Sequence, residues 1–352
     1  LRPEDKVLVL ITRNYGVSDP ILNMGIPRLL LERGCKVITL SHLPGHSLDI
    51  SGEYPNLYWP FGQHILSGAK LIAHHPNLYA VYLTNHGCGP DTMLTHLFRR
   101  EMGGKPYLQI EVDEHFSKVG VITRVEAFLN SLSHRPVQPL PANFAIEDVP
   151  VRKAEMPARA KAGVPLFVPN LGLYTPPLTR YFAQNGADAR MLPAPDEHAV
   201  GLGRAQTGAK EYLPFAALLG GVLAEREKDG APAQFLIPQS EGAEADGQYA
   251  RVIRAELDRL GQGDAAIVAP MLERLYETAA DRDALVRALL AGDLAYAAPK
   301  AARNEPSTIL TWAELKTTAE AIGRMPIAGR KIAVVGTPLC QTVLDDGVWG
   351  TL

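Results

Sequence analysis

The chain has 352 residues, of which 46% are hydrophobic and 21% are charged, and its formal net charge at pH 7 is -3. These values are ordinary for a globular protein with one large or two smaller cores, and they exclude a fibrous or disordered chain. The charge balance gives no support to binding of nucleic acid or of a membrane surface. No apolar run is long enough to span a bilayer and the first residues do not resemble a signal peptide, so we expect a cytoplasmic protein.

The first part of the chain predicts repeated β-α-β units. Continuous apolar runs are typical of parallel strands covered by helices on both faces, and here they alternate with segments of helical periodicity. Strands are predicted at 6–11, 36–40, 78–84 and 106–112, and helices at 21–34, 91–104 and 121–132. This order predicts an α/β fold of Rossmann-like units, with parallel sheets covered by helices.

Composition divides the chain into two predicted domains. Residues 1–135 form an α/β domain, and residues 136–163, rich in Pro and Ala without periodicity, form a linker. Strands and helices alternate again over 164–325, which we interpret as a second α/β domain with a helical insertion. Residues 326–352 begin a further β-α unit or return the chain to the first domain.

The glycine-rich sequence GLGRAQTG, at 201–208, is interpreted as a loop. It follows no clear strand and lacks the Gly-Lys-Ser/Thr ending of a nucleotide-binding loop. We therefore expect it to lead into a helix near Glu211 without binding a nucleotide.

Cys88 is the first candidate for chemistry, because it lies in a turn after a predicted strand. Ligands of open α/β sheets bind outside the carboxyl ends of the strands. Gly87 and Gly89 flank the thiol and let the backbone approach a bulky group. Pro90 and Asp91 then begin a helix, whose amino terminus attracts negative charge. The thiol is a candidate metal ligand or nucleophile, and the alternative is a small apolar side chain in a tight turn.

The sequence gives less support to a zinc site or a nucleophile at Cys88, and to acid/base residues after another strand. Zinc would need further cysteine or histidine ligands at a suitable spacing, and a nucleophile would need a base and an oxyanion hole, none of which the sequence identifies. The segment EVDEH ends another predicted strand and offers Glu111, Asp113 and His115 as a general acid and base. The alternative for this segment is a solvated turn with a helix-capping acid.

Five segments carry a resemblance to a known family, which extends over about two-thirds of the chain, from Asp19 to Gly261. They read DPILNMGIPRLLLERGCKVITL, YWPFGQHILSGAKLIAHHPNLYAVYLTNHGCGPDTMLTHLFRREMGGKPYLQIEVDEH, VGVITRVEAFLNSL, GAKEYLPFAALLGGVL and FLIPQSEGAEADGQYARVIRAELDRLG. These segments look like the activase-related proteins whose carboxyl-terminal part is similar to the iron-sulfur subunits of 2-hydroxyacyl-CoA dehydratases. The family's amino-terminal activase-like domains resemble ATPases of the sugar-kinase and actin type, which drive electrons into the dehydratase-like part.

The resemblance implies an α/β fold that holds a [4Fe-4S] cluster through three cysteines. Only the cysteine of the GCGP turn is matched, by Cys88, whereas Tyr212 and Glu244 stand at or near the other two positions. Because iron-sulfur clusters need soft thiolate donors, a phenol and a carboxylate predict that the cluster is absent. Cys340 also follows a predicted strand, but its spacing matches no cysteine of the family. Cys35, between a helix and a strand, is expected to be packed.

Three functional hypotheses result. The first is a dehydratase-like module without the cluster or another cofactor, which acts as a binding, scaffold or regulatory module for an acyl-CoA ester, activase-like domains or a partner subunit. The second is a cluster-bearing component of electron transfer or acyl-CoA dehydration, with Cys88 as a ligand. The third is an acid/base enzyme that uses Glu111, Asp113 and His115.

Overall fold

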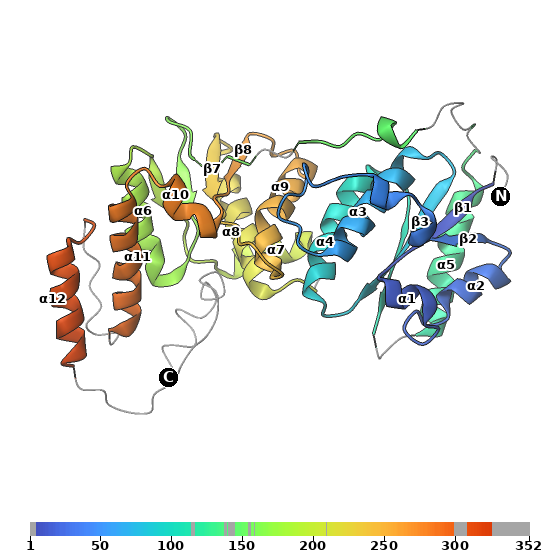
Figure 1. The fold of residues 1–352 in the computed structure, drawn as a ribbon, viewed down its shortest axis with the longest axis horizontal. Coiled ribbons are helices and arrows are strands. Elements are labelled where there is room, and N and C mark those ends of the chain that lie inside the picture. The colour runs from blue at the N-terminus through green and yellow to red at the C-terminus, as the bar shows by residue number, and fades with distance from the viewer. Residues whose placement is uncertain are drawn as a thin grey trace. The chain divides into compact units, whose positions relative to one another are not determined.

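In a computed structural model the chain forms two compact units. The first unit contains Leu1–Glu155 and Gly242–Gln248, and the second contains Met156–Glu241 and Tyr249–Leu352. Each unit contains one parallel sheet with its helices, which confirms the predicted α/β class (Figure 1). The predicted further β-α unit at 326–352 lies outside the described residues. The structure describes residues 5–113, 117–136, 139, 145–153, 156, 157, 159–208, 210–298 and 308–325.

The sheet of the first unit has four parallel strands in the order β2-β1-β3-β4. The central strands β1 and β3 are almost entirely buried, as their uninterrupted apolar sequences predict. The register aligns Val7 of β1 with Leu78 of β3, and Val81 of β3 with Leu108 of β4. The strands are β1 (Val7–Ile11), β2 (Lys36–Thr39), β3 (Leu78–Asn85) and β4 (Leu108–Val112).

Helices connect these strands and cover the sheet. They are α1 (Asn14–Ser18), α2 (Ile26–Glu32), α3 (Pro60–His74), α4 (Gly89–Met102) and α5 (Lys118–Ser133). Residues of α2 and α5 form one core cluster with the sheet, and Leu30, Val81 and Val125 are fully buried in it. Cys35 packs against this cluster, as expected. On β3, Tyr82 stacks on Phe98 of α4, with ring centroids 4.4 Å apart.

The sheet of the second unit repeats this topology, with parallel strands in the order β6-β5-β7-β8. Its strands are β5 (Leu166–Val168), β6 (Ala189–Met191), β7 (Ala233–Leu236) and β8 (Ala265–Val268). Its helices are α6 (Thr175–Gln184), α7 (Glu197–Gln206), α8 (Leu213–Asp229), α9 (Tyr249–Arg259), α10 (Leu275–Thr278), α11 (Arg282–Ala297) and α12 (Trp312–Gly323). The last three of these helices occupy the predicted helical insertion.

A short sequence repeat accompanies the repeated topology. Tyr58–Phe61 reads YWPF and Tyr212–Phe215 reads YLPF. The first begins α3, which leads into β3, and the second begins α8, which leads into β7. In both helices a proline lies in the first turn, where its missing N–H costs no hydrogen bond. The two units therefore share their strand order and this form of helix start.

Two predicted elements differ from the structure. The helix expected over 21–34 begins only at Ile26, because Gly25 before it adopts a left-handed conformation with φ 66°. The prediction of a loop at 201–208 was wrong, since α7 continues to Gln206. The carboxylate of Asp196 caps this helix by accepting a hydrogen bond from Ala199 N at 2.8 Å, so the helix starts well before the glycines.

The segment Gly242–Gln248 belongs to the first unit, although it connects β7 to α9. Asn56 fixes it through two hydrogen bonds: its side-chain Nδ2 donates to Gly247 O, and its backbone carbonyl accepts from Gln248 Nε2, both at 2.7 Å. Asn56 and Gln248 are buried, so these bonds replace lost contacts with water.

His64 of α3 gives the first unit a predicted pH dependence. Its ring stacks on that of His46, with centroids 3.9 Å apart, and burial followed by the charge of His46 lowers the pKa of His64 from 6.5. A lowered folded-state pKa means that the folded chain prefers neutral His64. Its contribution to stability is therefore complete above pH 6.5 and is lost as the pH falls below that value.

Urea unfolding at a series of pH values would measure this effect of His64. We expect the free energy of unfolding to fall with acidification less steeply in His64→Gln than in the unmodified chain. His134→Gln, which changes an exposed histidine, should retain the original slope. Equal slopes for all three proteins would contradict the prediction.

Candidate functional site

The candidate site lies at the carboxyl edge of the first sheet. In the order β2-β1-β3-β4, strands β2 and β3 lie on opposite sides of β1, so the chain reverses its direction of winding between β1 and β3. The connections that leave two such strands diverge, and the crevice between them is the usual ligand position in open α/β sheets. Arg13 and Tyr15 follow β1, whereas Asn85, His86 and Cys88 end or follow β3.

The turn and helix predicted around Cys88 are present. Cys88 is the N-cap residue of α4 and is partly buried. Gly87 has a φ of 65°, a conformation that strains other residues, and Pro90 lies in the first helical turn. Thr92 N donates to Cys88 O at 3.1 Å and closes that turn. The thiol is thereby held at the start of a long helix.

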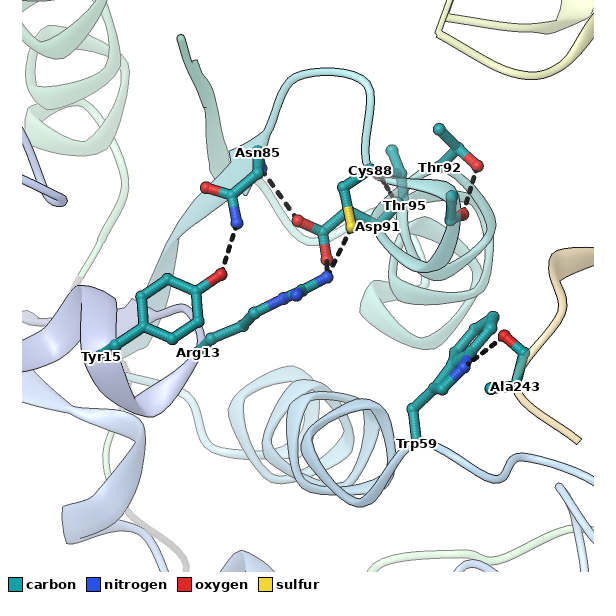
Figure 2. Close-up of polar contacts among 10 residues, drawn as sticks. Arg13, Tyr15, Trp59, Asn85, Cys88, Asp91, Thr92, Thr95 and Ala243 are labelled. Carbon is teal, nitrogen blue, oxygen red and sulfur yellow. Dashed lines mark hydrogen bonds and ion pairs between the residues drawn. The ribbon is translucent and has the colours of Figure 1, made fainter.

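Arg13 lies directly against the thiol, as Figure 2 shows. Its Nη2 donates to Cys88 Sγ at 2.6 Å and to Asp91 Oδ1 at 3.0 Å. The guanidinium also covers the ring of Phe61, with 4.3 Å between Cζ and the ring centroid. The Arg13 side chain is 20% exposed and that of Asp91 5%, so the ion pair is largely screened from water. Burial opposes the charge of Arg13, but Asp91, Cys88 and Tyr15 together outweigh it and raise the pKa of Arg13.

Asp91 connects the two strand ends. Its second carboxylate oxygen, Oδ2, accepts a hydrogen bond from Asn85 N at 2.9 Å. The Asn85 side chain in turn donates from Nδ2 to the hydroxyl of Tyr15 at 2.8 Å (Figure 2). One polar network therefore joins residues after β1 to residues at the end of β3, and it orients the guanidinium beside Cys88.

Tyr82 adds a buried hydroxyl close to this network. Its side chain is 1% exposed, and its hydroxyl has no hydrogen-bond partner among the described residues. Burial, followed by the charge of Asp91, raises the pKa of Tyr82 well above its usual value, so the phenol stays protonated. The charge of Arg13 lowers the pKa of Tyr82 and that of Cys88 raises it, but both effects are smaller than those of burial and Asp91.

A second pair of titratable side chains lies at the ends of β3 and β4. His86 Nδ1 is 2.7 Å from Glu111 Oε1, and both side chains are accessible to solvent. Of the three predicted acid/base residues, Glu111 is therefore paired with His86. Asp113 follows β4 and is partly buried, and His115 lies outside the described residues. Sequence reasoning missed His86 as a partner because 25 residues separate it from Glu111.

The two other residues predicted from the resemblance lie in different units. Glu244 is exposed within Gly242–Gln248, the segment that belongs to the first unit. The indole of Trp59 holds this segment by donating from Nε1 to Ala243 O at 2.9 Å (Figure 2). Tyr212 is the N-cap residue of α8 in the second unit and is 48% exposed.

The donor set at Cys88 does not fit a [4Fe-4S] cluster. Among the described residues one sulfur atom is present there, and the side chain that donates a hydrogen bond to it is an arginine, which has no lone pair to offer a metal. Within the described ranges, no group of three or more His, Cys, Asp or Glu side chains could hold a metal ion. Cys35 is packed against the core, and Cys340 lies outside the described part of the chain.

Sequence reasoning did not identify Arg13, Tyr15 or Asn85. A signal for them exists, because each lies at or just beyond the carboxyl end of a predicted central strand, where polar side chains of α/β folds gather around ligands. The sequence does not show which of these strand ends are neighbours, and so it does not connect Arg13 to Cys88.

Comparison with protein-family models, with curated proteins and with solved structures gives no match to this chain. The helices of the described residues include none whose length and apolar character would allow it to cross a membrane.

Proposed function

We propose that the chain is a dehydratase-like module of an activase-related protein and works in cytoplasmic acyl-CoA metabolism without a [4Fe-4S] cluster. It binds an acyl-CoA ester at the carboxyl edge of the first sheet and acts with activase-like domains or a partner subunit. The observation that carries the proposal is the 2.6 Å contact between Arg13 Nη2 and Cys88 Sγ. The five family-like sequence segments support the assignment to acyl-CoA metabolism.

The physical argument concerns what a guanidinium can bind. Arg13 keeps its positive charge at all physiological pH values and offers donors in a planar fork, which suits phosphate and carboxylate groups and excludes metal coordination. CoA esters carry several phosphate groups. A site that presents this cation beside a thiol at a helix amino terminus therefore favours an anionic ligand over a four-iron cluster.

Iron and acid-labile sulfide assays on the anaerobically purified chain test the absence of the cluster. We expect no stoichiometric iron, even after reconstitution with iron and sulfide, because one thiolate cannot hold the cluster. About four irons per chain that disappear in Cys88→Ala would instead establish the cluster-bearing component of electron transfer or acyl-CoA dehydration. About four irons per chain that persist in Cys88→Ala would place a cluster elsewhere and also contradict the proposal.

Calorimetric titration with crotonyl-CoA tests the binding site. Arg13→Gln removes a charge-assisted contact and should weaken binding about tenfold. Lys118→Gln, which removes an exposed positive charge at the start of α5, should leave the affinity unchanged. Equal affinities for the two variants would show that the carboxyl edge does not hold the ester.

Acid/base catalysis is a second candidate, which the 2.7 Å pair of His86 and Glu111 favours. A carboxylate that accepts a hydrogen bond from an imidazole at the end of a strand has the arrangement of a general base and its partner. Such chemistry would exchange protons of the bound crotonyl-CoA with D2O, and Glu111→Gln would abolish that exchange. If the unmodified chain shows no exchange, this candidate is excluded.

A further inference from the structure

A cavity in the second unit is lined by none of the residues of the candidate site. It has a volume of ≈ 280 Å³, just below the range of about 300–1,000 Å³ for ligand sites in proteins. Its lining includes Tyr181 and Phe182 from the end of α6, together with Pro270 and Leu275. Tyr181 is buried, so this part of the lining belongs to the packed interior. The cavity is therefore suited to a small apolar group.

Positive charge borders this apolar cavity. Arg159 and Lys161 belong to its lining, and both are exposed at their outer ends. None of the described residues that line the cavity is acidic, and the Lys161 ammonium has no ion pair within the described part of the chain. A cation with no counterion among the described residues, next to apolar side chains, is complementary to a ligand with one anionic end and one apolar end.

The backbone that carries Lys161 is fixed by a buried side chain. Gln234 of β7, which is 1% exposed, accepts from Lys161 N at 2.7 Å and donates to Lys161 O at 3.0 Å. Its Nε2 also donates to Val164 O at 3.0 Å. This buried amide holds the backbone N–H and carbonyl of Lys161 before β5. The point at which the Lys161 side chain leaves the backbone therefore has a defined position beside the cavity.

We propose that the cavity binds a small amphipathic carboxylate, such as a medium-chain fatty acid. The apolar chain lies against Tyr181, Phe182 and Leu275, and the carboxylate pairs with Lys161. This site is distinct from the Arg13–Cys88 site in the first unit, so it can exist whether or not the proposed function is correct. The two proposals are tested by different ligands and by different variants.

Titration of the full chain with butanoate, hexanoate, octanoate and 1-octanol tests the site. Each added methylene should strengthen carboxylate binding about fourfold while the cavity has room. Octanoate should bind about threefold to fivefold more tightly than 1-octanol, because only octanoate forms the ion pair. Absence of binding at millimolar concentration, or equal affinity for octanoate and 1-octanol, would overturn the proposal.

Three variants locate the ligand. Lys161→Gln should weaken octanoate binding about threefold to fivefold and leave 1-octanol binding unchanged. Lys316→Gln, an exposed lysine of α12 with no ion pair within the described residues, should change neither. Ala187→Leu adds three carbon atoms to the lining and should abolish the dependence on chain length, with circular dichroism confirming the fold. An octanoate affinity equal in Lys161→Gln and Lys316→Gln would show that the carboxylate lies elsewhere.

Discussion

Replacement of Lys70 by methionine is expected to lower the free energy of unfolding of the first unit by about 3–5 kcal/mol. Lys70 lies on α3 with a side chain that is 3% exposed. Its ammonium Nζ is 2.8 Å from Glu53 Oε2 and 2.6 Å from Glu101 Oε2. Methionine fills a similar volume but leaves two buried carboxylates without their shared cation, and uncompensated buried charge is among the costliest defects in a protein.

The network around Lys70 explains why the effect should be large. Glu101 Oε1 accepts a hydrogen bond from the hydroxyl of Tyr54 at 2.5 Å, and Glu53 Oε2 accepts one from Arg152 N at 3.0 Å. Burial, followed by the charge of Glu101, raises the pKa of Tyr54 well above its usual range, so its hydroxyl remains a donor. Lys70 therefore holds together α3, α4 and two connecting segments through a single ammonium.

Urea unfolding followed by the fluorescence of the buried Trp59 would measure the loss in Lys70→Met. Lys118→Met makes the same chemical change at an exposed position and should alter stability by less than about 0.5 kcal/mol. Tyr54→Phe should be intermediate, at about 1–3 kcal/mol, because it removes one hydrogen bond to a buried carboxylate. A loss of stability in Lys70→Met no greater than in Lys118→Met would contradict the buried network.

Substitution of Gly220 by alanine is expected to destabilise the second unit by about 3 kcal/mol. Helices α7 and α8 cross so closely that a Cβ at Gly220 would lie 1.7 Å from Ala199 O, and one at Gly203 would lie 1.8 Å from Ala216 O. Real carbon and oxygen atoms cannot approach to such distances, and here the obstacle is backbone. The helices must therefore separate, which loses packing along the whole contact.

The neighbouring Gly221 provides a matched control within α8. A Cβ at Gly221 would meet no atom within 4 Å. Gly221→Ala should therefore stabilise the unit by about 0.5–1 kcal/mol, since alanine loses less backbone entropy in a helix than glycine does. Urea unfolding followed by circular dichroism would compare the two variants. Equal effects for Gly220→Ala and Gly221→Ala would show that α7 and α8 do not cross at Gly220.

Gly203 also shows where the prediction from sequence was wrong. GLGRAQTG, at 201–208, is interpreted from sequence as a loop because it follows no clear strand and lacks the ending of a nucleotide-binding loop. The structure places Gly203 inside α7, where the absence of a side chain allows α8 to pack closely. A glycine that serves packing and one that serves a turn look alike in sequence, since only the neighbouring element distinguishes them.

For the candidate site, the sequence correctly indicated a tight turn and a helix start at Cys88. Gly87, Pro90 and the preceding apolar strand are local signals, and each has a local physical cause. The chemical surroundings of the thiol were not indicated. The contact with Arg13 spans 75 positions in the chain, and it depends on β1 and β3 being neighbours in the sheet.

The sequence by itself therefore determined the parallel α/β class and the strand ends that carry polar side chains, because burial on both faces of a strand produces a continuous apolar run. Only the tertiary structure decided that Arg13 contacts Cys88, that His86 pairs with Glu111, and that Gly242–Gln248 belongs to the first unit. The physical reason is that hydrophobic periodicity specifies which face of an element is buried, whereas the identity of the neighbouring element depends on sheet order and on contacts between distant residues.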